Sequence, residues 1–363
     1  MHRASMMSSR KIGAAVFANR AFTLVELLLA MAILTVILIT LATVMSQTTG
    51  AWRQARSQLE QFREAETAFD SMNRRITDAV LNTYTDYEFP NGNRQLTPTR
   101  YIRQSDLHFV CGPARTGGAT APALLGAAAA PGHAVFFQGP FGEHESNGLT
   151  GLNTLLNAWG YFIEFGDDRG ERPAFLADPA GTQTRYRFRL KEFQQKTEQL
   201  TVFGAKLSSV TQPTTLYSWF APPALSGQGV HTLAENVVAL VIRPLSPDSS
   251  LAGSNQIASH YYYDSRAFQR GAGTPFEQAR SRHQLPPMLE ITVVVLDETS
   301  GAWLQDLHGS AMPDLGLGSL FQDAMAYEDD LATLESTLVS QKLHYRTLKK
   351  TVRLRNARWS TVD

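Results

Sequence analysis

The sequence predicts an α+β protein in which a long N-terminal helix packs on an antiparallel β-sheet domain. Leu27 to Met45 runs without one charged residue. After this run, apolar residues recur at three- and four-residue steps, which is typical of an amphipathic helix. Several later runs alternate polar and apolar residues or are rich in β-branched ones, as strands are. The 363 residues suffice for one large or two small domains after the first helix.

The apolar run is long enough to cross a bilayer. A helix rises about 1.5 Å per residue, so roughly twenty residues span the ~30 Å hydrocarbon core. We therefore expect a transmembrane helix over residues 22–46, with no Pro or Gly to kink it. The hydroxyls of Thr35, Thr40 and Thr43 are expected to bond carbonyls of their own helix.

A basic leader precedes this helix. Residues 1–21 contain four cations and no acid: Arg3, Arg10, Lys11 and Arg20. By the positive-inside rule, the N-terminus is expected to stay in the cytoplasm of a single-pass inner-membrane protein, with its C-terminal part exported to the periplasm. The rest of the chain then has 29 basic and 33 acidic residues, a net charge of −4. This mild negative balance argues against a nucleic-acid partner, which needs a basic surface.

One acid, Glu26, lies just inside the start of the apolar run. A carboxylate near lipid costs about 2.5–3.5 kcal/mol on insertion scales, so a specific partner is expected. The alternative is that Glu26 only reaches out to the lipid headgroups, as in an ordinary membrane anchor.

The residues Phe22-Thr23-Leu24-Val25-Glu26, followed by the apolar helix, resemble the class III signal of type IV prepilins and type II secretion pseudopilins. The resemblance implies that a prepilin peptidase cuts between Ala21 and Phe22, that Phe22 is then N-methylated, and that Glu26 directs assembly. The family usually has Gly before the cut where this chain has Ala21. Ala is the smallest substitute, so we expect slower processing.

Elementary electrostatics supports the same interpretation. Cutting before Phe22 creates an α-ammonium with a pKa near 8, which is positive at pH 7. In a bundle of parallel helices this ammonium can meet the Glu26 carboxylate of a neighbouring subunit, where both charges are partly desolvated. A secretory signal peptide is the other interpretation of the N-terminus, but residues 43–47 lack a small-x-small cleavage site, so we expect the helix to be retained.

Residues 47–81 are expected to continue the helix in amphipathic form and to pack on a sheet. The apolar stripe that predicts this consists of Leu59, Phe62, Ala65, Phe69, Met72, Ile76 and Val80.

Residues 82–363 are expected to form an exported globular domain with loop insertions at 82–98, 112–132, 204–230 and 246–284, which are rich in turn residues or polar. The predicted strands are 133–138, 159–165, 185–193, 237–242, 285–297 and 351–356, of which 285–297 suits a central position. We also predict a short helical start at 233–236 and a helix over 327–343, with Leu331, Leu334, Leu338 and Val339 on its buried side.

In strand 185–193 the alternating Arg185, Arg187, Arg189 and Lys191 predict a solvated basic face or, alternatively, a surface for an acidic partner.

A second, softer resemblance covers the last 130 residues or so. An apolar strand near residue 240, a Leu-Pro-Pro-led strand at 285 and the terminal Val352-Arg353-Leu354-Arg355-Asn356 are similar to the large minor pseudopilins of the J type. The ending over residues 345–359 also resembles the pilin-like Verru_Chthon cassette protein C family.

Motifs for catalysis are not found, so we do not expect an enzyme. The sequence has no G-x-S-x-G, H-E-x-x-H, P-loop or G-x-G-x-x-G pattern. Its single cysteine, Cys111, allows no intrachain disulfide and is expected to be buried in the run 107–110 that precedes it. The pairs Asp167–Asp168 and Glu143–Glu145 are candidates for a calcium site, but solvated acidic loops are the preferred interpretation, and no metal or cofactor is predicted.

The function expected from the resemblance is structural: a minor pilin-like subunit of a type IV pilus or type II secretion pseudopilus. Its partners are then other pilins or pseudopilins, the prepilin peptidase, an inner-membrane assembly platform and membrane lipid. One rival is a tip adhesin or DNA-uptake minor pilin with a ligand surface at 112–132 or 246–284. The other is a membrane-anchored exported enzyme, whose site is assembled from residues distant in sequence.

Overall fold

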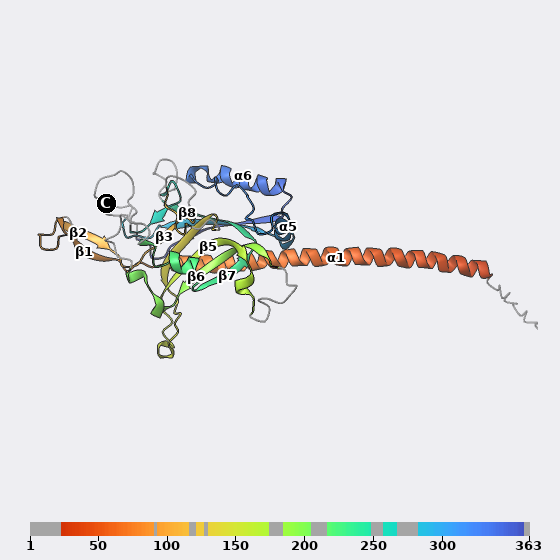
Figure 1. Ribbon diagram of the computed structural model, residues 1–363, viewed down its shortest axis with the longest axis horizontal. Coiled ribbons are helices and arrows are strands. Elements are labelled where there is room, and N and C mark those ends of the chain that lie inside the picture. The colour runs from red at the N-terminus through yellow and green to blue at the C-terminus, as the bar shows by residue number, and fades with distance from the viewer. Residues whose placement is uncertain are drawn as a thin grey trace, which may run out of the picture. The chain divides into compact units, whose positions relative to one another are not determined.

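The computed structural model describes residues 23–90, 93–115, 121–126, 130–173, 184–204, 216–247, 257–266 and 282–358. The chain divides into two units, Met1–Arg56 and Ser57–Asp363, and the boundary falls inside helix α1, Leu24–Thr77 (Figure 1). The architecture is α+β, as predicted: an apolar N-terminal helix and, in the second unit, antiparallel sheets.

In the first unit, α1 is apolar and exposed. Every side chain from Leu24 to Gly50 is exposed. The threonine hydroxyls return to carbonyls four residues earlier, as predicted, at 2.7 Å for Thr35, 2.6 Å for Thr40 and 2.8 Å for Thr43.

In the second unit, α1 buries the predicted stripe from Ala65 to Ile76. Ala65, Phe69, Met72 and Ile76 are all 5% exposed or less. The helix ends at Thr77, four residues before the predicted end at Leu81. The chain leaves the helix there because the Val80 amide bonds the Gln138 carbonyl oxygen of a neighbouring strand at 2.8 Å.

A six-stranded antiparallel sheet lies against this part of α1, in the order β7–β6–β5–β4–β3–β9. Its strands are β3 (Val110–Pro113), β4 (His133–Pro140), β5 (Leu156–Asp167), β6 (Tyr186–Gln195), β7 (Val230–Glu235) and β9 (Tyr263–Asp264). The predictions for β4, β5 and β6 are confirmed, whereas β3, β7 and β9 lie where no strand was predicted.

The other large sheet has three antiparallel strands in the order β11–β10–β8. These are β8 (Val237–Leu245), β10 (Met288–Leu296) and β11 (Tyr345–Arg353). The central position predicted for the proline-led strand is confirmed, because β10 pairs with both neighbours. The terminal strand starts at Tyr345, six residues earlier than predicted.

The two sheets meet at Asn236, between β7 and β8. Asn236 has φ +60°, a left-handed conformation that Asn tolerates better than most residues. The prediction of a helical start at 233–236 is therefore wrong, because these residues finish β7 and then turn into the second sheet. The Asn236 side chain donates to Glu298 Oε2 at 2.9 Å, which holds the corner in place.

The six-stranded sheet has a hydrophobic core on each face. One core contains the buried stripe of α1, alternate residues of the sheet such as Val135 and Ile163, and the apolar residues of β8 and β10. The other is aromatic: Phe136 stacks on Phe220 with ring centroids 4.0 Å apart, beside the short helix α3, Ala221–Leu225.

Two further helices follow β10 in the chain, and α6 lies over the three-stranded sheet (Figure 1). Helix α5 (Glu298–His308) was not predicted, and it starts directly after β10 with Asp297 as its N-cap, accepting from the Ser300 amide at 2.8 Å. Helix α6 (Tyr327–Ser340) buries Leu334 and Leu338, as predicted. The prediction for Val339 is wrong: it is 62% exposed, one residue round the helix from the apolar stripe.

A two-stranded ribbon stands apart from these sheets in Figure 1. It pairs β1 (Tyr84–Glu88) with β2 (Arg100–Gln104), inside and just after the segment predicted as turn-rich. Its rings of Tyr87 and Tyr101 pack with centroids 4.9 Å apart.

Candidate functional site

The start of α1 contains the predicted site residue Glu26, in a defined hydrogen-bonding arrangement. The first helical residue is Leu24, so Thr23 is the N-cap and Glu26 the third helical residue. The Glu26 amide donates to Thr23 Oγ1 at 3.3 Å, and the Thr23 amide donates back to Glu26 Oε2 at 3.2 Å. This reciprocal pair is a capping box, which satisfies amides that have no partner inside the helix.

Within the residues that the structure describes, only one oxygen of the Glu26 carboxylate accepts hydrogen bonds. Both donors of Thr23, its amide and its hydroxyl, bond Oε2, each at 3.2 Å. Among the residues that the structure describes, none donates to Oε1. A carboxylate at a helix N-terminus is also stabilised by the helix dipole. The other two predicted site residues, Ala21 and Phe22, lie outside the described residues.

The helix behind Glu26 meets the requirements of a membrane span. Leu24–Gly50 is 27 residues long and apolar, and it is the one such helix within the described ranges. At about 1.5 Å per residue it exceeds the ~30 Å of a hydrocarbon core. Glu26 is the only acid in it.

Two of the acids considered for calcium, Asp168 and Glu145, are engaged by protein groups. Asp168 pairs with Arg172 at 2.8 Å and accepts from the Arg185 amide at 3.0 Å, so it is part of a loop anchor rather than a solvated acid. Glu145 pairs with Lys196 at 3.3 Å. In the described parts of the chain, no three His, Cys, Asp or Glu side chains are grouped as a metal site would require.

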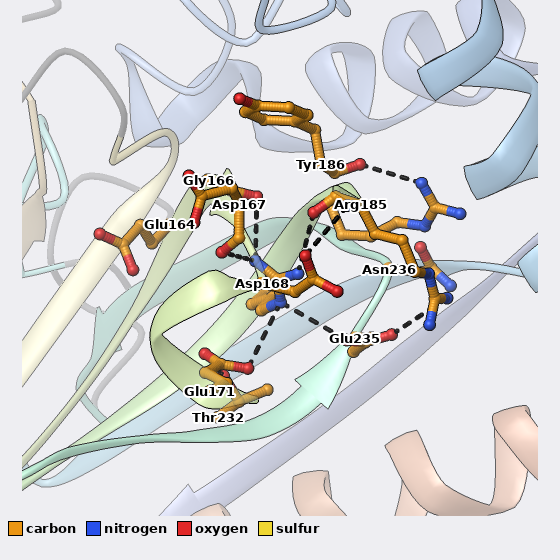
Figure 2. A network of polar contacts seen from close by, with 12 residues as sticks. Glu164, Gly166, Asp167, Asp168, Glu171, Arg185, Tyr186, Thr232, Glu235 and Asn236 are labelled. Atoms are coloured by element: carbon orange, nitrogen blue, oxygen red, sulfur yellow. Dashed lines mark hydrogen bonds and ion pairs between the residues drawn. The ribbon is translucent and has the colours of Figure 1, made fainter. Parts of the chain in front are cut away.

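The basic face of β6 is covered, and the prediction of a solvated face is wrong. Arg187, Arg189 and Lys191 are 4%, 1% and 8% exposed. Figure 2 shows the acids that meet this face from neighbouring segments, among them Glu171, which precedes the strand, and Glu235 at the end of β7. Alternation alone predicted which residues share this face of the strand, but not that acids distant in sequence would cover it.

Arg189 is the centre of this network. Its guanidinium donates to the carbonyl oxygens of Gly166 and Asp167 at 2.9 and 2.8 Å, and lies 3.5 to 3.6 Å from the carboxylates of Glu235 and Glu171. Burial raises the pKa of Glu171, but hydrogen bonds from Lys191 and Thr232 outweigh it, so the pKa is below its ordinary value. The network therefore joins β5, β6 and β7 and is not a surface for an acidic partner.

A second buried cluster was not predicted. His108 Nε2 lies 2.9 Å from Asp264 Oδ1, and the indole N–H of Trp219 donates to His108 Nδ1 at 3.0 Å. Because an indole nitrogen can only donate, Nδ1 must be unprotonated, so the ring is neutral and Nε2–H donates to Asp264. Burial correspondingly lowers the pKa of His108. No spacing signal links these residues, since 111 positions separate His108 from Trp219.

The single cysteine is buried, as predicted. Cys111 is fully buried in β3, and burial raises the pKa of its thiol far above the ordinary value. A buried thiol of this kind is structural rather than reactive.

The two segments considered as ligand surfaces are described only in part, because 116–120, 127–129, 248–256 and 267–281 lie outside the described residues.

Comparison with known proteins identifies the class of the N-terminal site. The prokaryotic N-terminal methylation motif matches residues 17–42, which include the expected cut and Glu26. This motif supports a type IV pilin-like or pseudopilin-like protein, anchored by a membrane helix, and suggests a structural role rather than an enzymatic one. No curated protein and no solved structure shows significant similarity to the chain.

Proposed function

We propose that this protein is a minor pilin-like subunit of a type IV pilus or of a type II secretion pseudopilus. It is extracted from the inner membrane into a helical assembly through its N-terminal helix. The observation that carries the proposal is the combination of the methylation motif over 17–42 with an exposed apolar helix whose only acid is Glu26. Its partners are other pilins or pseudopilins, the prepilin peptidase and an inner-membrane assembly platform, and its C-terminal domain is exported.

Processing is the first step of this mechanism. The peptidase cuts between Ala21 and Phe22, and the new terminus on Phe22 is methylated. Ala21 carries one methyl group more than the Gly usual at this position, which slows cleavage. Ala21→Gly is therefore expected to raise the processed fraction in a pulse-chase experiment, and a lower processed fraction would contradict this placement of the cut.

Assembly uses the open oxygen of Glu26. With Thr23 holding Oε2, the Oε1 atom is free to accept from the Phe22 ammonium of a neighbouring subunit. In the low dielectric of a helix bundle this attraction is much stronger than in water. The capping box fixes the direction of the carboxylate before the partner arrives, so pairing sets axial register as well as affinity.

Two substitutions separate the charge of Glu26 from its capping role. Glu26→Gln keeps a capping-box residue but removes the charge, whereas Glu26→Leu removes both. We expect both variants to be processed and inserted, and to be lost from sheared filaments or pseudopili. Thr23→Ser, which keeps the box, is the control and should assemble. Normal incorporation of Glu26→Gln would show that the charge pair does not direct assembly.

The same variants distinguish the rival enzyme. A membrane-anchored exported enzyme would keep its turnover in Glu26→Leu, because its chemistry does not depend on assembly.

We place the subunit at a tip or initiating position, since a head as large as residues 82–363 would crowd a tight helical lattice. Immunogold labelling along the whole length of a filament would contradict this position. Membership of the J type or of the cassette family is proposed on the terminal strands alone.

A further inference from the structure

The second unit contains a cavity of about 380 Å³ that the assembly mechanism does not use. It lies where β3 ends and β4 begins, and residues 312–322, between α5 and α6, form its other wall. Its lining is mainly apolar and includes Pro131, Phe188 and Leu317. Small-molecule sites in proteins have this size and character, with few polar groups that fix the ligand's orientation.

Arg115 supplies the positive charge of this cavity. Its guanidinium lies against Gly318, where a Cβ atom would meet Nη2 at 2.9 Å. Within the described part of the chain, no carboxylate or carbonyl oxygen accepts a hydrogen bond from Arg115. Arg115 is only half-buried, so its donors reach water at the edge of the cavity and are available to a ligand that binds there.

The other polar side chains of the wall are already bonded. His133 Nδ1 accepts from the Ile242 amide at 3.0 Å, and burial lowers the pKa of His133 to about 4, so the ring is neutral at pH 7. Asp314, the acid of the wall, is exposed to solvent, and its carboxylate accepts from the Gly316 amide at 2.9 Å. Arg115 is thus the group of the lining that is left to select a ligand.

We infer that this cavity binds a carboxylate carried on an apolar group, with Arg115 as the anion-binding residue. A guanidinium fork matches the two oxygens of a carboxylate, and the walls of Pro131, Phe188 and Leu317 take the apolar body. A phosphate fits less well, because one cation in an apolar wall cannot balance two negative charges. The carboxylate has two possible sources: a free small acid, or the C-terminus of an apolar peptide.

Isothermal titration calorimetry on the full chain in phosphatidylcholine nanodiscs tests the inference. The probes are 4-phenylbutyrate and N-acetyl-Phe-Leu with a free C-terminus, each paired with its primary amide. We expect at least one acid to bind with a Kd below about 1 mM and its amide to bind at least about 10-fold more weakly, since a charge-assisted pair is lost. The acid that binds more tightly identifies the source.

Arg115→Gln is expected to abolish the difference between acid and amide while leaving the urea midpoint of the head unchanged. The matched control is Arg94→Gln, which removes a cation whose side chain is 80% exposed, beside β1, and should bind the acid normally. If Arg115→Gln proves unstable, the wild-type comparison of acid with amide still decides. Equal affinity for acid and amide, or no binding of either acid at millimolar concentration, would overturn the inference. Neither result depends on processing or filament assembly, so the proposed function is tested separately.

Discussion

Lys350 Nζ lies 2.8 Å from Asp70 Oδ1, and this contact joins β11 to α1 across 280 positions of sequence. Two similar pairs flank it: Arg346 with Glu66 at 3.5 Å, and Arg355 with Asp78 at 2.8 Å. Glu66 and Asp70 lie one turn apart on α1 and Asp78 directly follows the helix, whereas the cations lie on and just after β11. These ion pairs hold β11 against the second half of α1.

These ion pairs orient the helix but contribute little stability. Lys350 and Asp70 are about half exposed, at 48% and 53%, and exposed pairs contribute about 0–1 kcal/mol each. The buried stripe of α1 contributes more, because each large apolar side chain that is buried stabilises by about 1.5–3 kcal/mol. On the other side of the helix, Arg75 bonds Glu192 at 2.9 Å and lies 4.0 Å from the ring of Trp159.

We therefore predict that Ile76→Ala lowers the free energy of unfolding by about 2–5 kcal/mol, because it leaves a cavity under the helix. Asp70→Ala should lower it by less than about 1 kcal/mol. Urea unfolding of the full chain in detergent, followed by tryptophan fluorescence, measures both. A larger loss in Asp70→Ala than in Ile76→Ala would mean that the ion pairs, not the stripe, hold the helix.

The buried network of β6 should depend strongly on its central cation. Arg189→Leu leaves the buried carbonyl oxygens of Gly166 and Asp167 without their donor and removes the cation that lies between Glu171 and Glu235, so we expect a loss of about 3–5 kcal/mol. The control is Arg100→Leu, which breaks the exposed pair with Glu88 on the ribbon and should cost less than about 1 kcal/mol. Comparable unfolding midpoints for the two variants would show that Arg189 is not essential to the fold.

The buried histidines predict that acid destabilises the head. His133 has a pKa of about 4 when folded, against an ordinary value of 6.5. The unfolded chain therefore binds this proton more readily, and stability that is fully present above about pH 6.5 is lost as the pH falls toward 4. Burial lowers the pKa of His283 as well, to about 3, which adds in the same direction.

His133→Asn, which can still accept from the Ile242 amide, should reduce this pH dependence. The measurement is the urea midpoint between pH 7 and pH 4 for wild type and variant. An unchanged slope in the variant would show that protonation of His133 is not what destabilises the head.

The capping box at the start of α1 should be detectable on its own. Thr23→Ala removes both the acceptor of the Glu26 amide and the hydroxyl donor, which costs about 0.5–2 kcal/mol at a helix N-terminus. Faster hydrogen exchange of the Leu24 to Leu27 amides in nanodiscs is the expected readout, and Thr23→Ser should exchange like wild type. If Thr23→Ala exchanges at the wild-type rate, the box does not stabilise this end.

The sequence predicted the elements whose periodicity is local. The stripe through Phe69 and Ile76 has the helical spacing, and the β-branched run of β10 has the composition of a central strand. What it did not predict depends on partners distant in sequence. The turn at Asn236 is fixed by contact with Glu298, and the basic face of β6 is covered by acids from four other segments.

The same contrast between local patterns and partners distant in sequence applies to the candidate site and the cavity. Glu26 could be identified from the sequence because a lone acid in an apolar run is a local signal. The three-residue spacing between Thr23 and Glu26 is also a local signal, but the capping box that it forms was not predicted. The cavity beside Arg115 could not be predicted from the sequence, because it is formed by segments near residues 115, 133, 188 and 317, which meet only in the folded chain.

The decisive measurement of the assembly mechanism is the mature N-terminus, determined by mass spectrometry of protein from its native membrane. We predict a chain that begins at Phe22 with an N-methyl group, which leaves open only which filament the subunit joins. An intact Met1, or a cut near residue 46, would contradict the assembly mechanism and favour an anchored or secreted enzyme.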